Sequence, residues 1–229
     1  MSTHASVRHS QLVLEVLIEQ ECERRRIMSA CAEDVASWEA GPLLWLTKHT
    51  RTEDTHWLAK GTNFLERFPQ KEYLRVVMQY LLSEPALFII KSREMMMSWL
   101  VTGYIAWMCT TQPVFWVAQT AKEDKVGELV EYARILYRNQ EPWMQARNPL
   151  VVDNELELKW AKGGRFLGVP KGADQIRIHH PYGYFQDESA FLPEAREAFD
   201  AVRPVAHQIV CVSTDELGWF HDSCELETT

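Results

Sequence analysis

Residues 87–99 read LFIIKSREMMMSW. The apolar residues at the start predict a buried strand, the polar residues after them a short loop, and Ser98 the opening of a helix. This strand–loop–helix order is the layout of a phosphate-binding loop. The Gly-Lys pair that usually precedes the Ser is absent, because Met96 and Met97 stand there, and a cation lies instead at Lys91, the first loop position. The stretch by itself is a weak match, and its meaning depends on two segments downstream.

The first of these segments is YGYFQDE, residues 182–188, which ends in two adjacent carboxylates. Its apolar and aromatic residues predict a strand. In nucleotide-hydrolysing P-loop proteins an acid at a strand end helps to hold Mg²⁺, which predicts that role for Asp187. A second acid beside it can deprotonate the attacking water, which predicts a general base at Glu188. The alternative is a solvated turn or a helix cap.

The second segment is QIVCVST, residues 208–214, an apolar strand that ends in two hydroxyls. The ends of parallel strands meet at one edge of a sheet, where ligands bind in open α/β folds. Ser213 and Thr214 would then lie beside the γ-phosphate and sense its loss, with a plain strand-end turn as the alternative. Because strand patterns alternate with helical ones along the chain, we predict a mainly parallel, three-layer sheet.

In this order the segments resemble the ATPase domain of the large terminase subunit, the DNA-packaging motor of tailed bacteriophages. The resemblance spans about residues 64–220. Residues 91–99 resemble the deviant loop of one terminase branch, Lys-Ser-Arg-x-Met-Met-x-Ser/Thr-Trp. Residues 114–120 resemble its second strand, residues 185–188 its Asp-Glu box and residues 212–214 its coupling motif. Gln70 stands where the family has an adenine-contacting Gln, although a Gln at an exposed helix start is the alternative.

The sequence departs from the family in two ways. The coupling motif usually continues with Pro, where Asp215 stands here. Full chains of the family carry a second, nuclease domain, whereas this sequence ends at Thr229, just after the coupling motif. We therefore expect the resemblance to cover the motor half only, without the nuclease domain.

The resemblance implies an α/β fold with a three-layer P-loop NTPase core of the additional-strand, RecA-like type. We expect this core at residues 61–229, behind an N-terminal helical extension at residues 1–60. Within that extension, residues 10–38 have helical periodicity, and the polar residues 50–57 predict a loop.

The resemblance also implies ATP and Mg²⁺ as ligands. Glu188, Lys91 and Arg93 are the expected catalytic residues, and Ser98 and Asp187 the expected metal ligands. Lys91 would reach the β- and γ-phosphates, unless it is a surface Lys at a strand end. Arg93 would touch phosphate or lock the loop against an acid, and Ser98 also suits a plain helix start. The expected nucleotide-binding residues are Gln70, Lys91, Ser92, Arg93, Glu94, Met95, Met96, Met97, Ser98, Trp99, Ser213 and Thr214.

Ring motors also use an arginine finger from a neighbouring subunit. The sequence offers several candidates for it and does not choose among them. They are Arg134, Arg138, Arg147 and Arg165.

Composition limits the partners. A formal net charge of −8 argues against a protein that coats nucleic acid with its whole surface, but it leaves room for a local basic rim. None of the five Cys forms a CxxC pair, and Cys109 and Cys211 lie in apolar runs, which predicts buried free thiols and fits a reducing cytoplasm. No uncharged apolar run is long enough to span a membrane.

The function expected from the resemblance is a Mg²⁺-ATP-dependent packaging motor that translocates double-stranded DNA into a procapsid. It would act in the host bacterial cytoplasm as a homo-oligomeric ring, transiently docked on the procapsid through the portal protein, with a small terminase subunit as partner and no membrane. Two rivals remain. One is a protein that binds nucleotide without hydrolysing it, or a truncated prophage remnant. The other is a helicase-like ATPase outside packaging.

Overall fold

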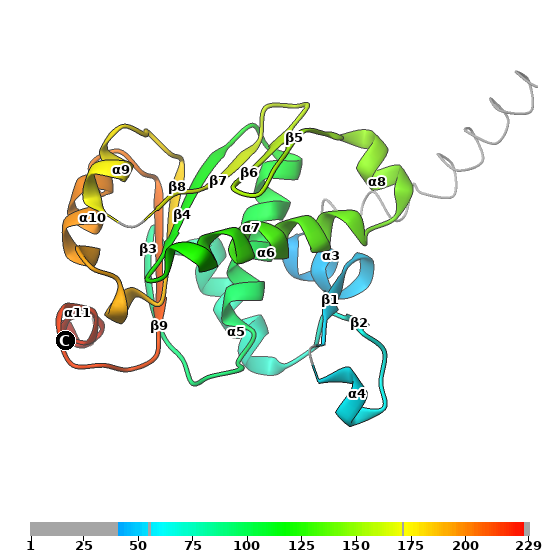
Figure 1. Cartoon of the computed structure of the whole chain (residues 1–229), viewed down its shortest axis with the longest axis horizontal. Helices are drawn as coiled ribbons and strands as arrows, with labels where there is room; N and C mark the ends of the chain where they lie inside the picture. Colours follow the sequence, from blue (N-terminus) through cyan, green and yellow to red (C-terminus); the bar gives the residue numbers. More distant parts are fainter. Residues whose placement is uncertain (1–40, 55, 171, 227–229) are drawn as a thin grey trace, which may run out of the picture. The chain divides into compact units, whose positions relative to one another are not determined.

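A seven-stranded sheet forms the centre of the fold (Figure 1). The computed structural model describes residues 41–54, 56–170 and 172–226, so the helix predicted at residues 10–38 lies outside the described residues. The strands, in spatial order, are β3 (Ala86–Ile90), β9 (Gln208–Ser213), β8 (Gly183–Asp187), β4 (Phe115–Thr120), β7 (Arg165–Gly168), β6 (Glu157–Trp160) and β5 (Leu150–Asp153). The first five are parallel to one another, β6 is antiparallel to β7, and β5 is antiparallel to β6. The predicted mainly parallel α/β sheet is confirmed.

Helices cover both faces of the sheet, as the buried apolar residues of β8 and β9 require. On one face α6 (Met97–Thr111) and α7 (Glu123–Arg138) pack on β4 and β7. There α3 (Pro42–His49) and α5 (Glu72–Ser83) pack against α6. The other face carries α9 (Ala173–Arg177), α10 (Ala195–Val202) and α11 (Trp219–Leu226), around a core that includes Tyr184 and Phe220 (Figure 1). Two short helical segments, α8 (Pro142–Arg147) and η1 (Ser189–Phe191), lie in connections.

The position of β9 defines the type of fold. It lies between β3, which leads into the loop at residues 91–96, and β8, which ends in the two acids. This is the additional strand expected of the P-loop core. The register pairs Ile90 with Ser213 and Val212 with Asp187. All three strands therefore end at the same level, at the carboxyl edge of the sheet.

Residues 50–57 are not the simple loop that their polarity predicted. Strand β1 (Arg51–Glu53) pairs antiparallel with β2 (Leu65–Arg67), and α4 (Trp57–Lys60) lies between them in sequence. The prediction was wrong because long-range pairing satisfies the backbone groups here, and because Thr52 is buried where β1 packs against α7. We call these two strands the β1–β2 ribbon. Its strands lie on either side of residue 60 in the sequence, and the boundary between extension and core at that residue stays a prediction.

Among the described helices, none combines the length and the hydrophobicity that crossing a bilayer requires. The free thiols predicted at Cys109 and Cys211 are confirmed as buried cysteines in α6 and β9.

Candidate active site

Three side chains predicted to act together meet at the carboxyl edge of the sheet. The Ser98 hydroxyl donates a hydrogen bond to Oδ2 of Asp187 at 2.6 Å, although 89 residues separate them. The Lys91 ammonium lies 3.5 Å from Oγ of Ser98 and 3.7 Å from Oδ1 of Asp187. The side chains of Lys91 and Asp187 are only 16% and 10% exposed, so each charge depends on the other group for compensation.

The loop between β3 and α6 contains no glycine, and two of its residues are left-handed. Helix α6 begins at Met97, one residue before the predicted start, and Met96 precedes it in the left-handed conformation with φ 57°. Glu94 is left-handed as well, with φ 62°. At the start of the loop, the Lys91 N–H donates to the Ser213 carbonyl at 2.9 Å, which joins the loop to the end of β9. Two non-glycine residues of the loop, Glu94 and Met96, therefore adopt a backbone conformation that glycine adopts at lower cost.

A cavity of about 460 Å³ opens beside this loop. Seven of the expected nucleotide-binding residues line it: Lys91, Glu94, Met95, Met96, Met97, Ser98 and Trp99. The opposite wall comes from the β1–β2 ribbon, α4 and the segment leading into α5. Several basic side chains in these walls, including Lys60, Lys71 and Arg67, suit a phosphorylated ligand.

Sequence reasoning missed most of this opposite wall. Thr52, Glu53, His56 and Arg67 carry no motif, and residues 50–57, which include strand β1, were predicted as loop. Tyr132 of α7 was also missed, and it stacks on Trp99 with ring centroids 4.2 Å apart. A partial signal existed, because the aromatic Tyr132 stands out among the charged residues of that helix.

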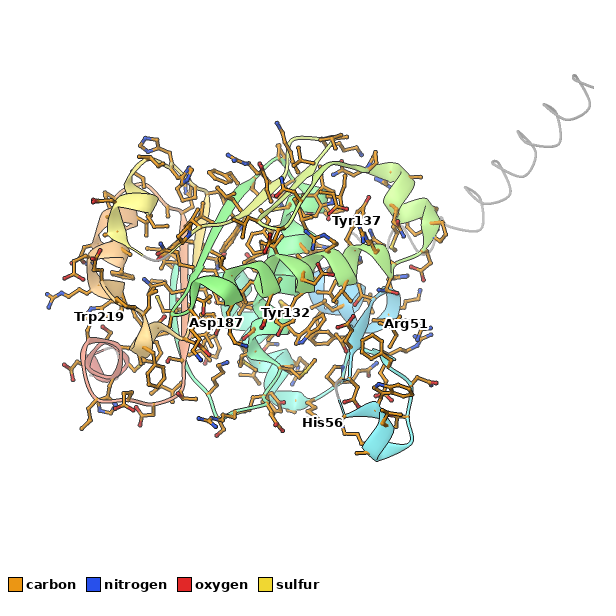
Figure 2. The ribbon with its side chains drawn as sticks, in the orientation of Figure 1. Arg51, His56, Tyr132, Tyr137, Asp187 and Trp219 are labelled. Atoms are coloured by element: carbon orange, nitrogen blue, oxygen red, sulfur yellow. The ribbon has the colours of Figure 1, made fainter. Side chains whose placement is uncertain are left out.

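Burial perturbs two groups in the cavity wall. It raises the pKa of the Tyr132 phenol and of the Glu53 carboxyl, and the nearby Glu131 adds to the effect on Glu53. In Figure 2, Tyr132 and Asp187 are labelled near the middle of the molecule, and His56 is labelled on the far wall of the cavity.

Several expected site residues do not line this cavity. Gln70 is exposed, although its neighbours Pro69 and Lys71 do line the cavity. Ser92 and Arg93 are exposed loop residues. Asp187, Glu188, Ser213 and Thr214 lie at or after the ends of β8 and β9, next to the Lys91 end of the loop.

Glu188 follows β8 in the left-handed conformation with φ 56°. Its N–H donates to Oδ1 of Asp187 at 3.1 Å, and its side chain is half-buried. Among the described residues, the Glu188 carboxylate forms no hydrogen bond or ion pair. Its charge interacts electrostatically with Lys125. A carboxylate that forms no hydrogen bond, one residue after Asp187 of the Lys91–Ser98–Asp187 cluster, can accept a proton from a water molecule.

Ser213 connects the loop to the segment after the acids. Its carbonyl accepts from the Lys91 N–H, and its hydroxyl accepts from the Ala190 N–H at 3.1 Å. Thr214, the next residue, is half-buried. Ser213 is therefore hydrogen-bonded both to the loop at Lys91 and to the segment that follows Glu188.

The oxygen donors present fit Mg²⁺. This ion is usually held by one or two carboxylates together with hydroxyl, water and phosphate oxygens. Ser98 and Asp187 supply a hydroxyl and a carboxylate in contact with each other. Within the described ranges there is no group of three or more His, Cys, Asp or Glu side chains that could hold a metal without a ligand's help.

Three of the four arginine-finger candidates, Arg134, Arg138 and Arg165, form ion pairs within the chain. Arg134 is buried and pairs with Glu131 and with Asp153. Burial would raise the pKa of Asp153, but hydrogen bonds from Arg134 and Arg138 outweigh burial and lower it. Arg165 pairs with Glu157. Arg138 and Arg147 are exposed.

The strand order is that of a fold class, the P-loop fold with an additional strand between β3 and β8. Two solved structures that share the fold come from a narrower group, the phage large terminases. The chain is similar to a mutant of the "Thermus Phage P74-26 Large Terminase ATPase domain", with a TM-score of 0.51 and 14% identity, over 75% of this chain and 74% of that one. It is also similar to the HK97 bacteriophage large terminase, with a TM-score of 0.55 and 9% identity, over 76% of this chain and 36% of that one.

These likenesses confirm, at the level of fold, the resemblance to the ATPase domain of phage large terminases. No protein-family model matches the sequence, and no curated protein sequence matches it either. The chain spans about a third of the HK97 protein, so the activity of a whole terminase is a proposal for this chain.

Proposed function

We propose that this chain is the Mg²⁺-ATP-dependent motor of a phage terminase and that it translocates double-stranded DNA into a procapsid. The observation that carries the proposal is the contact of Lys91, Ser98 and Asp187 at the sheet edge, where the N–H of the next residue, Glu188, donates to Asp187. The fold shared with phage terminase ATPase domains supports it.

In this proposal the chain's own groups bind and orient the nucleotide. The Lys91 ammonium contacts the β- and γ-phosphate oxygens as a point charge, and backbone N–H groups at the start of α6 face the phosphates. The nucleoside lies in the cavity between the loop and the β1–β2 ribbon. The Trp99–Tyr132 stack forms part of that wall.

Ser98 and Asp187 would hold Mg²⁺, which supplies charge neutralisation at the transferring phosphate. Glu188 orients a water molecule in line with the γ-phosphate and accepts its proton. Ser213 then transmits the loss of the γ-phosphate, because it is bonded both to the loop and to the segment after Glu188.

Work on DNA would require a ring of copies in the host bacterial cytoplasm, transiently docked on the procapsid at the portal protein, with a small terminase subunit as a further partner. The Glu188 carboxylate, which accepts no hydrogen bond from the described part of the chain, favours hydrolysis over mere nucleotide binding. The strained loop without glycine is the one observation that favours the rival, a nucleotide-binding protein that does not hydrolyse.

The test is Mg²⁺-dependent ATP hydrolysis with and without double-stranded DNA. We expect Glu188→Gln to lower kcat by about 10² to 10⁴ while ATP still binds, since the substitution removes only the proton acceptor. Lys91→Ala should lose binding as well. Ser98→Ala should lose most of the Mg²⁺-dependent hydrolysis, whereas Ser98→Thr keeps the hydroxyl and should retain it.

Arg196→Gln is the matched control, because this exposed residue of α10 lies outside the site. Stimulation by DNA would support the motor. ATP binding without turnover in the wild-type ring would favour the non-hydrolysing rival. The absence of both ATP binding and ATP turnover would overturn the proposal.

A further inference from the structure

A second cavity, of about 210 Å³, lies at the ends of α3 and α7. Four of its lining residues carry or can carry positive charge, namely Lys48, His49, Arg51 and Arg67, against one carboxylate, Glu141. This excess of positive charge contrasts with the formal net charge of −8 for the whole chain.

The two arginines are placed against each other. The register of the β1–β2 ribbon sets Arg51 directly opposite Arg67, so both side chains point to the same face. Like charges at directly opposite positions are destabilising. Within the described part of the chain neither guanidinium forms an ion pair, and the nearby Glu141 is taken by Nδ1 of His49 at 3.0 Å.

The wall of this cavity also holds unsatisfied polar atoms. Among the described residues, Nε2 of His49 and Nε2 of Gln140 are buried without a hydrogen-bond partner. The orientation of the Gln140 amide is fixed, because its Oε1 accepts from Nε1 of Trp45 at 3.0 Å. The free atom is therefore an amide N–H donor on a residue that lines the cavity.

From these observations we propose that the cavity binds a backbone phosphate of nucleic acid. Guanidinium groups recognise phosphate oxygens by two parallel hydrogen bonds, and a bound phosphate would relieve the repulsion between Arg51 and Arg67. None of the described lining residues is Phe, Tyr or Trp, so nothing in the cavity wall offers a ring on which to stack a base. The contact is with the backbone and independent of sequence.

The site adjoins the candidate active site. Arg67 lines both cavities, and the β1–β2 ribbon contributes residues to each. Figure 2 labels Arg51 well away from Asp187. The choice of double-stranded DNA as the nucleic acid rests on the proposed function.

A competing explanation is structural. Lys48 and His49 form the last turn of α3, and Asn139 caps the end of α7. Cations near helix C-termini stabilise them through the helix dipole. If that is their whole role, their removal lowers stability and leaves DNA binding unchanged.

The test is binding of a labelled DNA duplex, without nucleotide, measured by fluorescence anisotropy between about 50 and 200 mM salt. The site variant is Lys48→Gln with Arg51→Gln, which avoids Arg67 because that residue also lines the first cavity. The control is Arg196→Gln with Arg203→Gln, two exposed residues at α10 that remove the same charge. We expect the site variant alone to bind several-fold more weakly, with the slope of log K against log salt reduced by about 2.

Further arms separate the outcomes. Lys91→Ala should keep duplex binding, and the site variant should keep ATP hydrolysis measured without DNA, so this inference and the proposed function fail independently. Unchanged duplex binding in the site variant, or an equal loss in the control, would overturn the inference. The inference would also be overturned if the site variant lost the binding of inorganic phosphate but kept the binding of the duplex. Thermal unfolding of both variants shows whether a loss of affinity reflects a loss of folded protein.

Discussion

Met96 adopts a left-handed backbone conformation, with φ 57°, at the residue before α6 begins. For a residue with a Cβ this conformation costs roughly 1–2 kcal/mol, and glycine avoids that cost. We expect Met96→Gly to raise the free energy of unfolding by up to about 1 kcal/mol, because part of the relief is offset by the greater entropy of the unfolded chain. Urea denaturation measures the change.

Met95→Gly is the matched control, since Met95 is not among the positive-φ residues and has no strain of this kind to relieve. It should destabilise the protein. If both substitutions destabilised equally, the left-handed conformation of Met96 would not be a source of strain.

At the scale of elements, α6 and the residue that precedes β7 approach so closely that only glycine fits there. A Cβ on Gly164 would lie 1.8 Å from the backbone carbonyl oxygen of Cys109. Gly164→Ala should therefore destabilise the protein by about 3 kcal/mol or more, or prevent folding, because backbone atoms cannot move aside as side chains do.

Gly127→Ala supplies the contrast. Gly127 lies within α7, and its nearest neighbour would be a Glu155 side-chain atom at 3.5 Å, an ordinary contact. Alanine there should add up to about 1 kcal/mol of stability, because glycine disfavours the helix. Thermal or urea unfolding of the two variants tests the pair, and similar effects would contradict the packing described for β7.

The burial of strand β9 and helix α6 also sets a dependence on pH. Burial raises the pKa of the Cys109 and Cys211 thiols far above the ordinary value. As pH rises above about 8.5, the unfolded chain releases these protons while the folded chain keeps them. Each thiol should then lower the free energy of unfolding by about 1.4 kcal/mol per pH unit.

Urea denaturation at a series of pH values between about 7 and 10 measures this slope. Cys211→Ala should have a slope shallower by the contribution of one thiol, whatever its stability at neutral pH. An unchanged slope would show that the β9 thiol ionises as readily in the folded state as in the unfolded one.

At the scale of the whole molecule, the candidate site draws on distant parts of the chain, so ligand binding should stabilise all of it. A nucleotide that binds only the folded state adds about 2.7 kcal/mol at a hundred times its Kd. We expect Mg²⁺ with a non-hydrolysable ATP analogue to raise Tm in the wild type and not in Lys91→Ala. A rise of Tm in Lys91→Ala equal to that of the wild type would place the nucleotide elsewhere.

The sequence by itself determined the order of elements and the chemistry of the sheet edge. The apolar strands ending at Lys91, Asp187 and Ser213 carry local patterns, and parallel strands must place such ends at one edge. These patterns sufficed to predict the α/β class and to name the residues that form the Lys91–Ser98–Asp187 cluster, while the catalytic roles remain predictions.

Only the tertiary structure decided the cavity wall and the shape of the loop. The β1–β2 ribbon forms by pairing across the chain, and polarity alone predicted a loop there, because backbone hydrogen bonds leave no mark on composition. The left-handed Met96 and Glu94 were not predictable either, because neither is a residue type that favours this conformation and the surrounding contacts impose it. The same holds for Arg51 opposite Arg67, whose proximity follows from strand register, a property of the folded chain.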